Sequence, residues 1–503
     1  MFERIKGWVK GVGRALGLID NINKLREHKN INADELEYDR IDFNKRLYGG
    51  YVQEWHDLEY QGTIKKIKRK QRTLNMPKVL AKKLAKLTFN EGVKISIGED
   101  TGKEAQWELI KDVVTSNRFI REFQRYLEYM FAMGGVAVEV YLDGDEPKIA
   151  YATADAFFAL SQDTEQVDEA VIANQEKVDG RYYTLLKWHE WGEFENGHNY
   201  KITNELYESG NKDVIGDKVR LSKLYDDMEP VSLFTLEHPL FVYFKPNEAN
   251  NKNITSPLGI SVFENCQDTI RMLDVMYDFW WNEFRLGKRR VAVPEYLVKT
   301  QFNAQGKPYV TFDDSEELFV ALNSAEMDDM EMKDLTVDLR VGQIVESIQS
   351  LLDVLAMQVG LSPGTFTFQS GGVKTATQVV AENSETFQTR SSHLSIIEDG
   401  LRDLIMSIYE VATLDMQVSD PLERSDISID FNDGVFDDNQ SRLNYWRDGY
   451  KAGLVPREKA IERAFNLSSE EAREWAEQLQ ADTQQNVFSR QQAAAQAELG
   501  IER

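Results

Sequence analysis

Two stretches in the middle of the chain carry apolar residues at alternating spacings of three and four. In the first stretch these residues are Phe263, Cys266, Ile270, Leu273, Tyr277, Trp280 and Phe284. In the second they are Val341, Val345, Ile348, Leu352, Leu355 and Val359. A period of about 3.5 residues keeps one seam of a helix facing a neighbouring helix. The pattern predicts two helices that pack either as a hairpin within one chain or against copies of the same chain.

The rest of the chain mixes helical and strand patterns. Helical periodicity is found in residues 34–60, 76–89, 103–116, 118–133 and 375–414. Alternation typical of half-buried antiparallel strands is found in residues 136–141, 182–191 and 200–207. Hairpin turns are indicated at Asp143-Gly144, Asp179-Gly180 and Asn196-Gly197. Together these patterns predict an α+β fold that is mostly helical and ends in a helical tail.

A Gly-rich segment at residues 361–373 follows the second seam helix. It carries Phe366 and Phe368, which have no evident core partner, and it leads into Gly371-Gly372-Val373-Lys374-Thr375. A phosphate loop needs glycine directly before the lysine and a strand before the loop, and neither condition is met here. We therefore expect a flexible loop and no nucleotide site.

Charge is unevenly distributed along the chain. The 503 residues have a net charge of −25, which argues against a general nucleic-acid binder. Residues 301–340 hold ten acids against three cations, including a run in which methionines are interleaved with Glu326, Asp328, Asp329, Glu331 and Asp334. Residues 61–90 hold ten cations and no acid. This basic stretch is either a phosphate-contacting surface or a solvated face over a buried one.

The amino terminus is predicted to form an amphipathic helix. Residues 2–19 place apolar side chains on one face, with Lys6, Lys10 and Arg14 opposite, which is typical of a helix that lies on a membrane surface or docks onto a protein. Charges throughout the first 25 residues interrupt a secretory signal, and no apolar run is long enough to cross a bilayer. We expect the chain to begin in the cytoplasm, without integral membrane association.

Sequence motifs for catalysis or metal binding were not found. The six histidines have no paired ligand spacing, the single Cys266 cannot build a zinc site, and no Gly-x-Ser-x-Gly elbow occurs. Cys266 lies on an apolar seam, where a buried packing role is expected. The sequence therefore predicts a protein that is not an enzyme and has no cofactor and no metal.

The order of these parts resembles portal proteins of tailed double-stranded DNA phages, particularly long-tailed phages of Gram-positive bacteria. The most specific stretch is Lys374-Thr-Ala-Thr-Gln-Val-Val-Ala-Glu-Asn-Ser-Glu-Thr-Phe-Gln-Thr-Arg390. It is similar to the start of the long helix that follows the tunnel loop in that family. Residues 74–92 and 257–263 are also similar, and the resemblance covers nearly the whole chain.

The resemblance implies a portal fold that assembles as a ring of about twelve copies around a central channel. In that fold, residues 1–256 and 375–432 would form the wing and residues 433–503 the crown. Residues 257–287 and 341–360 would be the stem helices, residues 288–340 the clip, and residues 361–374 the tunnel loop. Subunits would meet along Phe263, Ile270, Leu273, Tyr277, Trp280, Phe284, Val345, Ile348, Leu352 and Leu355.

By the same resemblance, the protein would sit at one capsid vertex of the virion, after assembly in the host cytoplasm, and pass DNA during packaging and ejection. Tunnel-loop residues expected to touch the duplex are Phe366, Thr367, Phe368, Gln369, Ser370 and Lys374. The acidic clip run would face partners, and the implied partners are the terminase large subunit, a head-tail adaptor, and the major capsid and scaffolding proteins. Alternatives are a nuclease or ATPase of the packaging system, or a minor head or baseplate protein without a channel.

Overall fold

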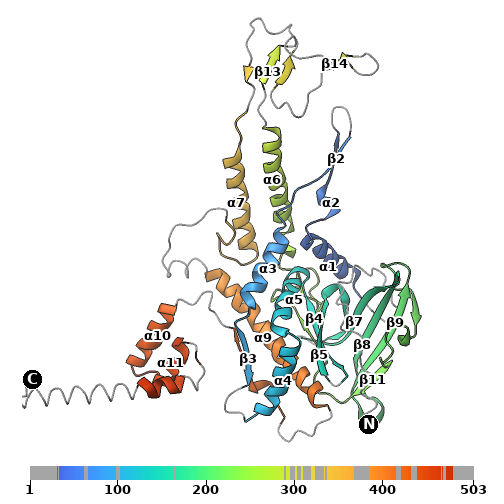
Figure 1. Ribbon diagram of the computed structural model, residues 1–503, viewed down its shortest axis with the longest axis vertical. Helices are drawn as coiled ribbons and strands as arrows, with labels where there is room; N and C mark the ends of the chain where they lie inside the picture. The colour runs from blue at the N-terminus through green and yellow to red at the C-terminus, as the bar shows by residue number, and fades with distance from the viewer. Residues whose placement is uncertain are drawn as a thin grey trace, which may run out of the picture. The chain divides into compact units, whose positions relative to one another are not determined.

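The computed structural model describes much of the chain (Figure 1). The described residues are 31, 33–61, 66–97, 102–144, 146–162, 166–287, 291–294, 301–302, 308–309, 319–322, 333–334, 337–367, 384–414, 421–431, 439–465, 467 and 472–479. The chain divides into two compact units. The larger unit comprises the described parts of residues 1–372 and 381–431, and the smaller comprises those of residues 373–380 and 432–503.

Helices and sheets both contribute to the larger unit, which confirms the α+β prediction. Its helices are α1 (Glu35–Tyr48), α2 (Gln53–His56), α3 (Met76–Thr88), α4 (Glu104–Ser116), α5 (Phe119–Met133), α6 (Gln267–Leu286), α7 (Val341–Gln358) and α9 (Ser384–Thr413). None of the described helices has the length and apolar character required to cross a membrane.

Two antiparallel sheets form its centre. The first has the order β12-β4-β5, from β12 (Phe241–Phe244), β4 (Val136–Asp143) and β5 (Glu146–Thr153). The second has the order β10-β9-β8-β7-β6, with β11 also on β9, and its strands are β6 (Phe157–Gln162), β7 (Val167–Val178), β8 (Arg181–Trp191), β9 (Tyr200–Ser209), β10 (Asp217–Val219) and β11 (Val231–Phe234). Asp179 and Gly180 both have positive φ between β7 and β8, as the sequence predicted for this turn.

Smaller strand pairs complete the unit. These are β1 (Asp57–Gln61) with β2 (Lys66–Lys70), β3 (Val93–Ile97) with β18 (Ile427–Phe431), and β14 (Gln301–Phe302) with β15 (Pro308–Tyr309). Within the predicted acidic insertion, β13 (Val291–Pro294) lies between β16 (Phe319–Leu322) and β17 (Lys333–Asp334). The helical stretch indicated in residues 34–60 ends near Gly49-Gly50, where Gly50 has φ +78°, and the chain then continues as α2 and β1.

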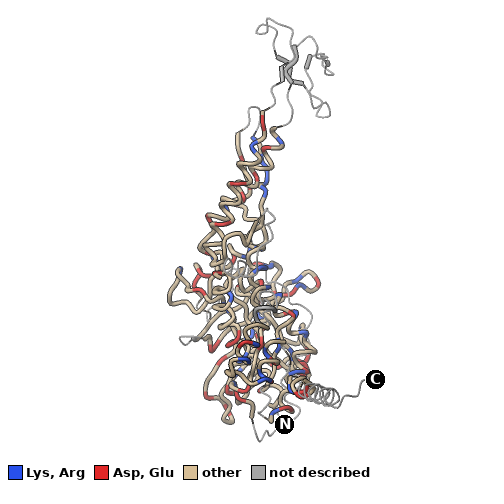
Figure 2. The backbone as a smooth tube through the Cα atoms, turned by 90° about the vertical axis from the view of Figure 1, so that its left-hand side faces the viewer, with Lys and Arg blue, Asp and Glu red and all other residues tan. Residues whose placement is uncertain are grey.

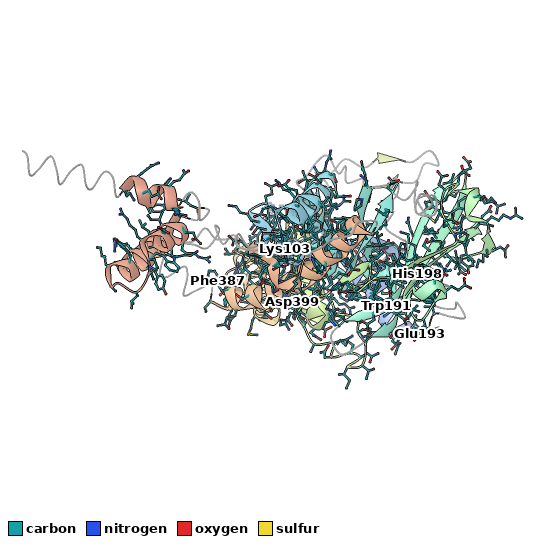
Figure 3. The ribbon with its side chains drawn as sticks, turned by 90° about the horizontal axis from the view of Figure 1, so that it is seen from below. Lys103, Trp191, Glu193, His198, Phe387 and Asp399 are labelled. Carbon is teal, nitrogen blue, oxygen red and sulfur yellow. The ribbon has the colours of Figure 1, made fainter. Side chains whose placement is uncertain are left out.

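An aromatic core joins α5, the first sheet and α9. The centroid of the Phe123 ring lies 4.9 Å from that of Phe89 and 5.0 Å from that of Phe244, and all three rings are buried. Gly400 of α9 packs directly on the Phe244 ring, where a Cβ would come within 2.6 Å of a ring carbon. The helices α4 and α9 pack against each other. In Figure 3, α9 carries the labelled Asp399, and the labelled Lys103 directly precedes α4. The Nζ of Lys103 donates to Asp426 at 2.7 Å and ties α4 to the segment before β18.

The end of α5 determines where α6 begins. Gly134, at φ +91°, and Gly259 lie so close that a Cβ on either would come within 2.5 Å of the other's carbonyl oxygen. Val262 then donates its amide to the carbonyl of Phe131 at 3.1 Å. Cys266, buried as expected, caps the start of α6. This packing anchors the α6–α7 helix pair to the aromatic core.

The smaller unit is helical, as predicted for the tail. Its described helices include α10 (Asn439–Lys451) and α11 (Arg457–Phe465). Ile461 of α11 packs with Ala472, Ala476 and Leu467 in a small apolar cluster.

Candidate functional site

The α6–α7 pair is an antiparallel hairpin whose contact buries most of the predicted seam (Figures 1 and 2). Ile270 and Leu273 on α6, and Ile344, Ile348 and Leu355 on α7, are all at most 3% exposed. Arg340, just before α7, donates to the carboxylate of Glu283 near the end of α6 and closes the pair at that end. Part of the predicted seam is therefore buried within one chain.

The residues predicted to contact other subunits differ in their exposure within the single chain. Phe263 precedes α6, lying before a short 3-10 turn, and it is fully buried. Leu352 is buried between α6 and α7. Tyr277, Trp280 and Val345 are half-buried, and Phe284 remains 51% exposed. The buried members are covered by their own chain, because an amphipathic helix buries its stripe against the nearest apolar surface.

A second apolar stripe on α6 is exposed. Its members are Met272, Val275, Phe279 and Leu286, with exposed fractions of 56%, 49%, 39% and 54%. Met272 and Val275 lie two positions after the buried Ile270 and Leu273, and two positions turn an α-helix by about 200°. This exposed stripe therefore lies on the side of α6 opposite α7. On one edge, the guanidinium of Arg340 lies 5.3 Å from the centroid of the Phe279 ring.

The outer surface of α7 has a different chemistry. Gln343, Glu346, Ser347 and Ser350 are exposed, and α7 contains two acids and no Lys or Arg. Val354 and Met357 are the exposed apolar residues near its end. A surface of this kind offers no cation to a phosphate backbone.

The polar face of α6 that carries Asp274 and Asp278 binds the β1–β2 hairpin. Asp278 accepts a bidentate pair from the Arg69 guanidinium at 2.7 and 2.5 Å, and a further bond from the Arg72 amide. Burial alone would raise the pKa of Asp278, but these bonds from Arg69 and Arg72 hold it below its usual value. The basic stretch of residues 61–90 thus has an acidic partner for Arg69 inside the protein.

Asp274, one turn earlier on α6, is also buried and fully engaged. It accepts from the Thr73 hydroxyl at 2.7 Å and from the Leu74 amide at 2.9 Å. His56 Nε2 lies 3.2 Å from an Asp274 oxygen, and His56 Nδ1 lies 2.8 Å from the amide nitrogen of Val52. Nothing in the sequence marks these partners, because Thr73 and Leu74 lie about 200 positions away along the chain.

The segment after α7 is held on two sides. Asp353 of α7 accepts from the Gly364 amide at 3.1 Å, and Gln349 donates to the Phe366 carbonyl at 2.9 Å. On the α9 side, the hydroxyl of Thr386 accepts from the Ser362 amide at 2.9 Å, and both residues are buried. The first seven residues of the loop predicted to be flexible are therefore anchored to both helices.

Several predicted contact residues lie outside the described part of the chain. Phe366 is half-buried and Thr367 is exposed. Asp334 forms part of β17. The remaining members of both predicted sets lie outside it, namely Phe368, Gln369, Ser370 and Lys374 of the loop and Glu326, Asp328, Asp329 and Glu331 of the acidic run.

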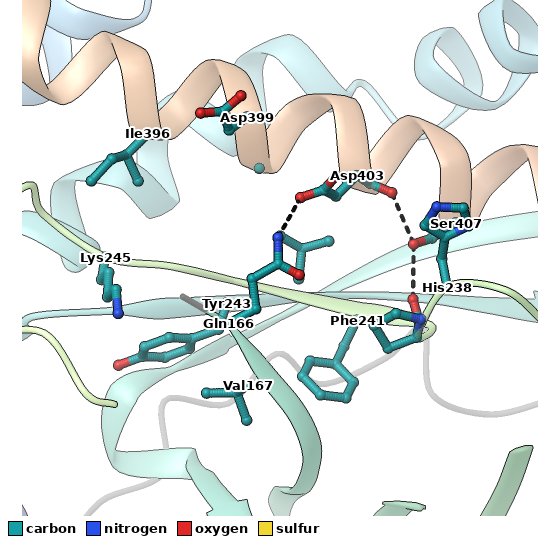
Figure 4. A pocket seen from close by; sticks show the side chains of 13 residues that line it. Gln166, Val167, His238, Phe241, Tyr243, Lys245, Ile396, Asp399, Asp403 and Ser407 are labelled. Atoms are coloured by element: carbon teal, nitrogen blue, oxygen red, sulfur yellow. Dashed lines mark hydrogen bonds between the residues drawn. The ribbon is translucent and has the colours of Figure 1, made fainter. Parts of the chain in front are cut away.

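A cavity of about 430 Å³ lies between α9 and β12 (Figure 4). Among the groups that line it, Asp403 accepts from Gln166 at 3.0 Å and also from Arg424 at 2.7 Å. Beside it, Glu237, His238 and Glu410 bring possible metal-ligand atoms within 4.8 Å of one another. His238 Nδ1 lies 2.5 Å from a Glu410 oxygen. This hydrogen bond raises the pKa of His238 above its usual value, burial opposes the rise, and the nearby acids add to it. The Glu410 carboxylate of α9 also accepts from the amides of Glu237 and His238, so it is bound by protein groups and joins α9 to the segment before β12.

Comparison with known proteins gives a family match over most of the chain. Residues 27–485 match the sequence model of the family described as phage portal protein, SPP1 Gp6-like. Among curated proteins, none matches the chain. A solved chain from the virion of a native gene transfer agent particle is similar at 11% identity and a TM-score of 0.38, covering 77% of this chain and 87% of that one.

Proposed function

The chain belongs to the SPP1 Gp6-like family of phage portal proteins, and from this premise we propose that it forms a ring around a channel through which double-stranded DNA enters and leaves the capsid. The ring would sit at one capsid vertex of the virion and act mechanically, without catalysis of its own. Family membership supports the portal role, and the surfaces of the α6–α7 pair support the ring.

The observation that carries the ring is the exposed α6 stripe. Met272, Val275 and Phe279 are spaced by three and four residues, and Leu286 lies two turns further along α6. An exposed apolar row of this kind is a surface that a second helix covers. Because the stripe lies opposite α7, a helix placed on it extends the row of helices in one direction. Two different surfaces then meet at each contact, and repetition of such a head-to-tail contact closes into a ring when the rotation permits.

The lumen would be lined by the outer surface of α7. Its cation-free, acidic and uncharged polar side chains make few tight phosphate contacts, so DNA can move past without sticking. Residues 361–374 would form the tunnel loop. Because residues 361–367 are tied to α7 and α9, we place the DNA contacts at its later members, Phe368, Gln369, Ser370 and Lys374.

The acidic insertion would be the clip and the docking surface for other proteins. Its run Glu326, Asp328, Asp329, Glu331 and Asp334 is suited to partners with basic surfaces. We assign the terminase large subunit and the head-tail adaptor to this end. The major capsid and scaffolding proteins would meet the wing, built from the larger unit below the helix pair, and residues 433–503 would form the crown.

Purified protein tests the proposal directly. Native mass measurement at micromolar concentration should give one oligomer of about twelve copies, and images of single particles should show rings with a central hole. Assays of the same sample for ATP hydrolysis and DNA cleavage should give no activity above a buffer control. A monodisperse monomer, or either activity at rates typical of packaging enzymes, would overturn the proposal.

A further inference from the structure

The β1–β2 hairpin projects beside α6 as a ribbon of two strands with five residues each (Figure 1). Isolated two-stranded hairpins are marginally stable in water. Here the base is fixed to α6 through Arg69, Thr73 and His56, as described above. Buried polar contacts therefore fix the orientation of this ribbon, which has no third strand among the described residues.

The register of the hairpin gives it two unlike faces. Leu58 lies opposite Arg69, and Tyr60 lies opposite Ile67. These four side chains share one face, because directly opposed residues of an antiparallel pair point to the same side. Arg69 binds Asp278, so this inner face is the one turned toward α6.

The outer face is charged and solvated. Lys66 and Lys68 share one acid, Glu59, at 3.1 and 3.0 Å, and their side chains are 70% and 76% exposed. Such exposed pairs contribute little to stability. The outer face therefore needs no further partner.

The inner face is different, because α6 does not cover it completely. Tyr60 is 42% exposed, although it lies on the side turned toward the helix, and Leu58 and Ile67 are half-buried. The helix face that holds the hairpin lies about 100° around α6 from the exposed stripe, since Asp278 directly precedes Phe279 and Asp274 directly precedes Val275. The inner face and the stripe are therefore two apolar walls that meet along α6.

We propose that these two walls receive one helix from a second copy of this chain, so that the hairpin is an arm that holds the neighbouring subunit. The inference rests on the proposed ring and names the element that secures each contact in it. The occupant is a second copy because the stripe that forms one wall is also the surface on which the next helix pair would sit. Anchoring at Asp274 and Asp278 sets the pose of the arm before assembly, which lowers the entropic cost of forming the contact.

Site-specific photo-crosslinking on purified rings tests the arm. With benzoylphenylalanine in place of Tyr60 on the inner face, irradiation should produce a ladder of covalently linked subunits on denaturing gels. The matched control places the same group at Lys68 on the outer face, where we expect no ladder. Absence of a ladder from position 60 in intact rings, or a ladder from position 68 alone, would overturn the proposal.

Substitution gives an independent measure. Ile67→Glu should weaken ring association about tenfold, whereas Lys68→Glu should change it less than threefold. Both variants should keep the wild-type thermal melting of the dissociated subunit, because Arg69 and Asp278 remain in place. Equal effects of the two variants on ring association would refute the arm. A wild-type chain that forms no ring would instead refute the proposed function.

Discussion

Replacement of Phe279 by serine tests the exposed stripe quantitatively. The ring of Phe279 is 39% exposed in the single chain. For a side chain of about 200 Å², this fraction leaves roughly 80 Å² for a partner to cover. At about 25 cal/mol per Å², covering that area contributes about 2 kcal/mol at each subunit contact. We therefore expect Phe279→Ser to weaken each contact by about 30-fold.

The assay is the distribution of ring and subunit on dilution, measured by mass photometry. The matched control is Leu36→Ser, which removes a side chain that is 78% exposed on α1, away from the helix pair. Phe279→Ser should raise the concentration at which rings dissociate, whereas Leu36→Ser should leave it unchanged. Thermal melting of the dissociated subunit should change little in both variants, because neither side chain is buried within the chain.

The stripe hypothesis would fail if the two variants dissociated at the same concentration. It would also fail if Phe279→Ser destabilised the dissociated subunit as much as it weakened the ring. In that case the residue would be needed for the fold of one chain and would say nothing about contacts between chains.

Three further predictions follow from groups inside the larger unit. Burial raises the pKa of Glu248 to about 7. The free energy of unfolding should therefore fall as pH rises from about 4.5 through 7, by an amount on the order of 3 kcal/mol. In urea titrations Glu248→Gln should remove this dependence of stability on pH. Burial opposes ionisation of Glu139, but Lys187 and His189 hold its pKa near 2. The free energy of unfolding should therefore fall as pH drops from about 4.5 to 2. Lys187→Met should lower it by roughly 3–5 kcal/mol at pH 7, because a buried carboxylate loses its partner. Asp353→Ala removes the acceptor for the Gly364 amide, so hydrogen exchange at that amide should accelerate while exchange in the middle of α7 stays at the wild-type rate.

The sequence predicted the larger elements because their patterns are local. The helices α3, α4, α5, α6 and α7, the strands β4, β8 and β9, and the turn at Asp179-Gly180 all follow from periodicity and turn chemistry within a few residues. The strand β1 was not predicted; it spans only five residues and follows the short helix α2 directly.

Placement of the polar groups could not be predicted in the same way. Asp274 and Asp278 occupy polar positions of a heptad, and such positions usually face solvent. Their burial depends on a hairpin that is adjacent only in the folded chain. For the same reason the sequence could not separate Arg69, which points inward, from Lys66 and Lys68, which point outward.

The same heptad spacing occurs twice on α6, and this explains why the first assignment of the seam was incomplete. One series includes Ile270, Leu273 and Tyr277, and the other, displaced by two positions, includes Met272, Val275 and Phe279. A displacement of two positions rotates a helix by about 200°, so the two series face opposite sides. A helix that is apolar on opposite sides is not a surface helix, because water would face one of the two rows. With α7 covering one row and the hairpin fixed to the polar face between them, the remaining row requires a further helix, and the described residues of this chain supply none.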